Sequence, residues 1–326
     1  MKKEFRIGTR ESELALWQAN LIKNMLLEVG YTSTLVLIKS EGDVDLQTPL
    51  YEMGVQGIFT RSLDIALLND SIDIAVHSMK DVPTMIPNGI SQGAVIKRGN
   101  YRDLFIVNDK KYHGRKPPHG SFSPLRLSGD YDLMGDDLHS VATIATGSIR
   151  RKAQWLHRFP DHQIVNLRGN VNTRIQKIGD SDWDGAIMAA AGVERINIRP
   201  ASAVELDWML PAPAQGAVLA VCKSGDTESL EALQKLNDPD TEIAVNIERE
   251  FLRALMGGCS TPISALAIAD KKEVFFRGSI LSTDGKSKIE IEKQVSKNNL
   301  VGFGLKMGVD ILKDGGQEIL NQFKNG

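Results

Sequence analysis

The chain has 326 residues, of which 42% are hydrophobic and 25% charged, a composition typical of a globular protein with more than one core. Its formal net charge of −2 gives no overall field that would draw it to nucleic acid or an acidic membrane. Two cysteines are too few for a disulfide framework, and no metal-ligand spacing of Cys or His occurs, so we expect no metal. The N-terminal stretch reaches Glu4 and Arg10 before any long apolar run, unlike a signal peptide or membrane span. We therefore expect a cytoplasmic protein.

Short apolar runs alternate with helical periodicity from residue 5 to about 107. Ser12 is predicted to cap a helix that runs through Glu28, and Thr60 to cap a second helix. The predicted strands are FRIG (5–8), TLVLI (34–38) and IDIAV (72–76). This alternation predicts a mostly parallel, doubly wound sheet, whose functional loops leave the carboxyl ends of the strands.

A second unit of the same rhythm follows a long irregular segment. Residues 108–140 are rich in Gly, Pro, Ser and charge without a sustained period, which predicts a long loop or insertion. The elements predicted after it are the strands VATIA, QIVNL and GAIMAA and the helices IRRKAQWLHRF and VNTRIQKI. They indicate a second α/β lobe.

The C-terminal part has a different pattern. The apolar strand that ends LPAPAQGAVLAVC (210–222) precedes a long helix predicted to end at Gly257 and Gly258. Three successive strands and helices from about 298 to 324 follow, which predicts a smaller α+β domain. We expect three domains: domain 1, residues 1–97 with about 206–224; domain 2, residues 98–205; and domain 3, residues 225–326, which carries Cys259.

Residues 146–178 form a locally basic stretch, with arginines at 150, 151, 158, 168 and 174 against a single acid, Asp161. Gly147 and Ser148 follow a predicted strand and open a helix, where unpaired N–H groups suit anions. Arg150, Arg151, Arg168 and Arg174 are predicted to converge on one mouth and to bind carboxylate or phosphate. The alternative is a solvated basic face that contacts RNA, but few aromatic residues are interleaved with these arginines.

Polar residues also follow the predicted strand in AVHSMKDVPT (75–84), which ends in His77, Ser78, Lys80 and Asp81. Ligands bind at such a strand edge, and Arg10 and Ser12 reach the same edge from the first strand's loop. Lys80 and Asp81 form either a structural ion pair or a functional pair in which Asp81 stabilises a cation that develops on the substrate.

Cys259 lies in GGCSTPI, between two glycines and a nearby proline. Free cysteines are most often buried and inert, which suits Cys222 in its apolar strand. A helix C-terminus disfavours a thiolate, so Cys259 as a nucleophile would need cations from another domain. Both alternatives stay open on the residues alone.

Six motifs, in this order and at these intervals, resemble those of the porphobilinogen deaminase (hydroxymethylbilane synthase) family. They are TRESELALWQA, AVHSMKDVPT, TGSIRRKAQ, LRGNVNTR, PAPAQGAV and LMGGCSTPI. The resemblance implies a monomeric transferase of tetrapyrrole and heme biosynthesis with two periplasmic-binding-protein-like α/β domains and a smaller α+β domain. It implies that four porphobilinogen molecules are joined head to tail, with release of ammonia, to give hydroxymethylbilane. The product grows on a dipyrromethane cofactor that a thioether holds to Cys259.

The resemblance also implies roles for individual residues. Asp81 would bind pyrrole N–H groups and stabilise the azafulvene that forms when ammonia leaves. The implied catalytic residues are Asp81, Lys80 and Arg10. The implied cofactor-binding residues are Cys259, Ser78, Lys80, Asp81, Thr146, Ser148, Arg150, Arg151, Arg168 and Gly169. The implied substrate-binding residues are Arg10, Ser12, Arg168, Arg174 and Arg195.

The chain departs from the family pattern in QGIFTRSL, where the family usually reads KGLF-x-KEL. Gln56 replaces a lysine that meets cofactor carboxylates, and Ser62 replaces a glutamate, so we expect weaker cofactor binding or compensation elsewhere. Two other classes of function each explain part of the sequence. A periplasmic-binding-like protein for small anions, without catalysis, explains the lobes but gives Cys259 no role. An RNA-binding module built on residues 146–178 predicts salt-sensitive binding and indifference to Cys259.

Overall fold

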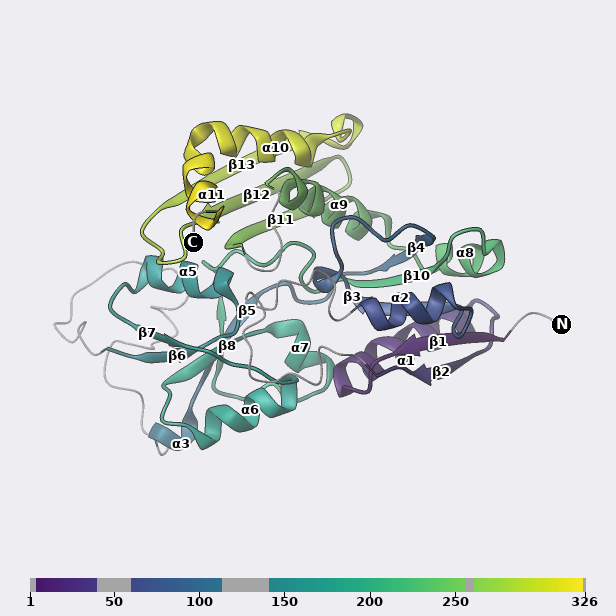
Figure 1. Ribbon diagram of the computed structural model, residues 1–326, viewed down its shortest axis with the longest axis horizontal. Coiled ribbons are helices and arrows are strands. Elements are labelled where there is room, and N and C mark those ends of the chain that lie inside the picture. The colour runs from purple at the N-terminus through teal and green to yellow at the C-terminus, as the bar shows by residue number, and fades with distance from the viewer. Residues whose placement is uncertain (1–3, 40–59, 113–140, 256–260, 325–326) are drawn as a thin grey trace.

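The structure is a computed structural model that describes residues 4–39, 60–112, 141–255 and 261–324 (Figure 1). Within these ranges the chain forms two five-stranded sheets and one three-stranded sheet. Gln56, Cys259, the predicted helix end at Gly257 and Gly258, and residues 113–140 of the predicted loop lie outside the described residues. The described part of the chain contains no helix long and apolar enough to cross a bilayer.

The first sheet has the strand order β2-β1-β3-β10-β4. Its strands are β1 (Phe5–Thr9), β2 (Ser33–Leu37), β3 (Ile74–Ser78), β4 (Ile90–Ile96) and β10 (Val218–Lys223). The strands β2, β1 and β3 are parallel, and β10 runs antiparallel to both of its neighbours. Since β10 comes from much later in the chain, the polypeptide leaves this lobe and returns to complete it.

The second sheet repeats this arrangement with the order β7-β6-β8-β5-β9. Its strands are β5 (Asp103–Val107), β6 (Thr143–Ala145), β7 (Gln163–Val165), β8 (Gly185–Ala189) and β9 (Ala203–Leu206). Three parallel strands are again followed by an antiparallel one, here β5. The predicted pair of similar, mostly parallel lobes is confirmed.

Helices cover both faces of each large sheet. The helices of the first lobe are α1 (Glu13–Glu28), α2 (Arg61–Leu68) and α8 (Thr227–Gln234). Those of the second are α3 (Asp109–Tyr112), α5 (Ile149–Arg158), α6 (Val171–Asp180) and α7 (Ala190–Arg195). Alternate residues of β3 enter opposite cores, with Ile74 and Val76 against α1 and Ala75 against α2. Cys222 is fully buried in the first of these cores, and burial raises the pKa of its thiol to about 11, as expected of an inert cysteine.

Two predicted helix caps have different outcomes. The Ser12 side chain accepts a hydrogen bond from the Ala15 amide at the start of α1, so that cap is confirmed. Thr60 occupies the N-cap position of α2, but its side chain makes no capping hydrogen bond, so that prediction is wrong. The backbone of Thr60 is already helical, and its hydroxyl interacts with the Asp64 carboxylate instead.

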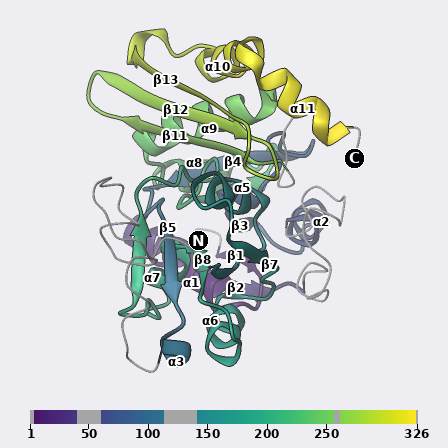
Figure 2. The same ribbon diagram turned by 90° about the vertical axis from the view of Figure 1, so that its left-hand side faces the viewer.

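The C-terminal unit is an antiparallel sheet of β11 (Ile263–Ala269), β12 (Glu273–Leu281) and β13 (Lys288–Ser296). The helices packed against it are α9 (Pro239–Ala254), α10 (Phe303–Ile311) and α11 (Gln317–Lys324). This unit lies above the two lobes in Figure 1 and in the rotated view of Figure 2. The predicted fold class, two α/β lobes and a smaller α+β unit, is confirmed. The predicted boundaries stay a prediction; α8, which follows residue 224, packs on the first sheet.

Candidate active site in a cationic cleft

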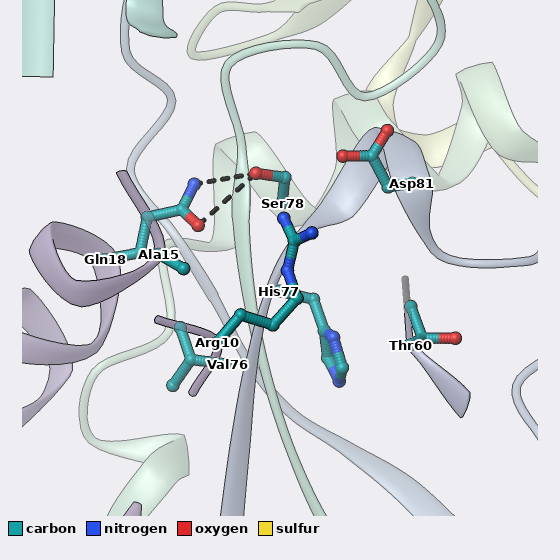
Figure 3. A pocket seen from close by; sticks show the side chains of 8 residues that line it. All are labelled: Arg10, Ala15, Gln18, Thr60, Val76, His77, Ser78 and Asp81. Atoms are coloured by element: carbon teal, nitrogen blue, oxygen red, sulfur yellow. Dashed lines mark hydrogen bonds between the residues drawn. The ribbon is translucent and has the colours of Figure 1, made fainter. Parts of the chain in front are cut away.

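The strand β3 delivers the first group of predicted site residues. Its buried run ends at Ser78, and a single 3-10 turn, η2 (Met79–Asp81), then turns Lys80 and Asp81 away from the sheet. Asp81 lines one small pocket with Arg10, which follows β1 (Figure 3). The Gln18 amide of α1 donates to Ser78 Oγ at 2.8 Å and fixes the side chain of Ser78 in this pocket. Polar groups from two parallel strands therefore meet at one sheet edge, as predicted.

His77 forms a neutral wall of this pocket. Its side chain is buried, and burial together with the positive charge of Arg10 lowers its pKa to about 3. A carboxylate oxygen of Asp64 is 3.9 Å from Nε2, and burial raises the pKa of Asp64. The imidazole is therefore uncharged at neutral pH and adds no cation to the pocket.

The second lobe supplies two arginines from the first turn of α5. Thr146 directly follows β6, and Ser148 caps the helix by accepting from the Arg151 amide. Arg150 and Arg151 are almost fully buried and share the carboxylate of Asp103, the first residue of β5. Arg150 Nη2 lies 2.7 Å from Asp103 Oδ2, and Arg151 Nη2 lies 2.8 Å from Oδ1. Although burial alone would raise it, these two charges hold the pKa of Asp103 at about 2.

Electrostatic interactions link these arginines to the other predicted residues. Burial, followed by the charges of Arg151 and Arg168, lowers the pKa of Arg174 to about 10, while Asp81 opposes the shift. Burial also lowers the pKa of Lys80, against the attraction of Asp81. The structure thus brings the arginines of α5, the loop after β7 and α6 to the edge where Lys80 and Asp81 lie.

These groups together carry more positive than negative charge. Lys80, Arg150, Arg151 and Arg174 face two carboxylates, Asp81 and Asp103. Two guanidinium groups share the single carboxylate of Asp103, and Arg150 Nε is buried with no hydrogen-bond partner among the described residues. Buried cations are costly unless an anion compensates them, so this arrangement fits a ligand with several carboxylates.

Arg195 lies apart from this cluster, at the seam between the lobes. Its Nη2 donates to the Gly216 carbonyl at 2.7 Å, and its guanidinium lies 5.2 Å from the centre of the Trp17 ring of α1. Burial lowers the pKa of Arg195 to about 10. Across the same seam, Asn172 Nδ2 of α6 donates to the Glu13 carboxylate of α1 at 2.6 Å. The substrate-binding role of Arg195 therefore stays a prediction.

The backbone conformation at position 169 requires glycine, and Ser12 is held in place as the N-cap of α1. Gly169 has a φ of +116°, and a Cβ at this position would lie 2.8 Å from the Thr173 side chain, so only glycine fits. Its carbonyl accepts from Arg174 Nε at 2.7 Å, which fixes that arginine.

Ser62, one of the departures from the family pattern, is half-buried in α2.

Asp103 and Gln215 are site residues that were not predicted from the sequence. Gln215 Nε2 donates to Asp103 Oδ1 at 2.9 Å and to the Tyr101 carbonyl at 2.7 Å, so it completes the shell around the shared carboxylate. The available signal for Asp103 was an acid directly before the apolar run LFIV, a position at the mouth of a buried strand. No group of three or more His, Cys, Asp or Glu side chains in the described ranges is placed to hold a metal ion.

Two family models together match most of the chain. One, described as "Porphobilinogen deaminase, dipyromethane cofactor binding domain", matches residues 5–231. The chain belongs to the porphobilinogen deaminase family. The second, "Porphobilinogen deaminase, C-terminal domain", matches residues 243–313. A curated porphobilinogen deaminase from Syntrophotalea carbinolica is 39% identical over 319 residues, which cover 97% of this chain and 94% of the relative. Membership carries the expected activity, the polymerisation of porphobilinogen to hydroxymethylbilane with a dipyrromethane cofactor.

Solved structures show more distant similarity. The periplasmic VFT2 domain of Bordetella pertussis BvgS aligns with a TM-score of 0.37 and 14% identity, covering 68% of this chain and 76% of that one. An ancestral cationic amino acid solute binding protein aligns with a TM-score of 0.39 and 13% identity, covering 72% and 87%. The strand order of the two lobes defines the fold more directly than these similarities.

Proposed function

We propose that the cationic cleft between the lobes is where porphobilinogen units are bound and joined. The observation that carries this proposal is the excess of buried cations around Asp81. Porphobilinogen carries two carboxylates, and a growing chain accumulates more of them with each unit. Forked guanidinium donors suit carboxylates, so the arginines hold the chain while the reacting end lies near Asp81. When bound, the dipyrromethane supplies the terminal pyrrole to which the first unit is added.

Asp81 stabilises the positive charge that develops as ammonia leaves the aminomethyl carbon of porphobilinogen. A fixed carboxylate in a partly buried cleft is effective because it needs no reorganisation when the charge forms. Lys80 and Arg10 flank this carboxylate and bind substrate carboxylates, which places the leaving group against Asp81.

The remaining residues are assigned by their place in the cleft. We assign cofactor carboxylates and pyrroles to Ser78, Lys80, Asp81, Thr146, Ser148, Arg150, Arg151, Arg168 and Gly169. We assign incoming substrate to Arg10, Ser12, Arg168, Arg174 and Arg195. Asp103 carries one negative charge for the two positive charges of Arg150 and Arg151, and the remaining positive charge attracts the cofactor carboxylates. Cys259 tethers the cofactor, and it follows α9 in the chain.

We also propose the wider setting of this activity. The division into residues 1–97 with about 206–224, 98–205 and 225–326 separates two lobes from the unit that carries the tether. We propose a monomeric, cytoplasmic enzyme with no nucleic-acid partner, which the net charge of −2 supports.

The test is a turnover assay with the purified protein and porphobilinogen as the sole substrate. We expect ammonia and hydroxymethylbilane to appear in a ratio of about four to one, measured by enzymatic ammonia detection and mass spectrometry, since each joining step expels one amine. Saturable binding of porphobilinogen without ammonia release would contradict the proposal and favour an anion-binding protein.

A further inference from the structure

The guanidinium of Arg249, on α9, is directed at the backbone of the turn that carries Asp81. Its Nη1 donates to the Val82 carbonyl at 2.9 Å, and its Nη2 donates to the Pro83 carbonyl at 2.6 Å. A longer contact of 3.5 Å joins Nη1 to the Met79 carbonyl. The side chain of Arg249 is 9% exposed, so these bonds lie largely out of water. One side chain therefore holds both ends of the segment that contains Lys80 and Asp81.

Met79 and Val82 pack in the core beside α2, but few backbone hydrogen bonds among the described residues fix the turn. A 3-10 helix of three residues satisfies few of its own carbonyls, and here the internal bond runs from the Val82 amide to the Met79 carbonyl. The Met79 amide donates to the Ala217 carbonyl of the first lobe, which secures only the start of the turn. The planar fork of an arginine donates from two nitrogens in fixed directions to two neighbouring carbonyls, whereas a lysine donates from a single nitrogen.

Burying a cation that donates only to carbonyls costs free energy, and packing alone does not explain that cost. The hydrogen-bond acceptors that the described residues offer Arg249 are all backbone carbonyls. Burial and the nearby charge of Arg253 lower the pKa of Arg249 to about 10. The cost is explained if the precise position of the turn matters for the chemistry.

Helix α9 is itself held rigidly against the region between the lobes. The residue before Arg249, Glu248, is fully buried and accepts Arg98 Nη1 at 2.6 Å. It also accepts the amides of Ala214 and Ala267 at 2.6 and 2.7 Å. The contacts of Glu248 therefore hold α9 in place, and Arg249 links the position of the turn to the position of this helix.

We propose that Arg249 is a positioning residue for the reaction: it fixes the Met79–Pro83 segment so that Asp81 faces the cleft. It also couples this segment to α9, the helix that precedes Cys259 in the chain. This inference rests on the proposed role of Asp81.

The test compares Arg249→Met and Arg249→Lys with the control Arg253→Met. Arg253 lies one turn further along α9, is exposed, and contacts Met85 Sδ at 3.6 Å. We expect Arg249→Met to lower kcat roughly ten- to hundred-fold, the usual effect of a small misplacement of a reacting group, with KM changed less than about threefold. Arg249→Lys should fall between Arg249→Met and the unchanged protein, and Arg253→Met should match the unchanged protein.

Hydrogen exchange of the segment 76–85 provides a readout that does not depend on turnover. We expect faster exchange in Arg249→Met and no change in Arg253→Met, which would support the inference even if the unchanged protein lacked the proposed activity. A kcat of folded Arg249→Met within about twofold of the unchanged protein would overturn the inference, as would unchanged exchange. If Arg249→Met does not fold, kcat and hydrogen exchange are measured on Arg249→Lys instead. A lower kcat with faster exchange supports the inference, and unchanged values overturn it.

Discussion

Asp81→Asn is expected to lower kcat by at least about 10²- to 10³-fold, the usual cost of removing one preorganised group that stabilises charge in the transition state. Asparagine keeps the size and a hydrogen-bonding oxygen but removes the negative charge. Asp81 attracts Lys80 and Arg174, so without its charge the cation that forms as ammonia leaves would face these two positive groups and lose the attraction of this carboxylate. Single-turnover measurement of ammonia release isolates this step.

The variant is expected to fold normally, because Asp81 is half-buried and lies at the end of a turn rather than in a core. The matched control is Asp70→Asn, which removes an exposed carboxylate that pairs with Lys223 at the protein surface. That change should leave kcat within about twofold. A near-normal rate in Asp81→Asn would assign the charge stabilisation to another group.

Asp103→Asn is expected to reduce the free energy of unfolding by about 3–5 kcal/mol, the usual cost of breaking a buried ion pair by removing one partner. Arg150 and Arg151 would remain buried beside an amide that presents donors as well as an acceptor. Urea denaturation measures the loss, with Asp180→Asn as the control, since Asp180 forms an exposed pair with Lys110.

The pH dependence gives an independent check on this pair. Because the folded pKa of Asp103 is about 2, below its ordinary value of 3.8, its stabilisation is complete above that value and is lost as pH falls toward 2. The difference in stability between the unchanged protein and Asp103→Asn should therefore shrink over that interval. A loss below about 1 kcal/mol at neutral pH would mean that the two arginines do not depend on Asp103.

The sequence predicts best the elements whose hydrophobic pattern and capping residues lie within the element itself. β3 is a continuous apolar run that is buried on both faces, the period of 3.6 in α1 buries one face, and the serines at positions 12 and 148 provide local helix caps. The polar group after β3 was predictable because parallel strands end at a common edge. These signals lie within a few residues of the features that they predict.

The partners across the fold could not be predicted in the same way. Arg150 and Arg151 were recognised as anion-binding donors, but their resident carboxylate comes from Asp103, far away in the sequence. β9 has only four residues and lies at the sheet edge, so it carries little hydrophobic pattern. Arg195 reads locally as a free cation, whereas Trp17 and Gly216 hold it at the seam. Such pairings are set by the strand order rather than by neighbouring residues.

The most direct test of the central claim is the intact mass of protein freshly purified from cells that supply porphobilinogen. We expect an excess over the mass of the bare sequence equal to two linked pyrrole units. The excess should disappear in Cys259→Ser and persist in Cys222→Ala, since Cys222 is buried in the core of the first lobe. A mass equal to the bare sequence, or an excess that survives in Cys259→Ser, would contradict a cleft built around a cofactor tethered at Cys259.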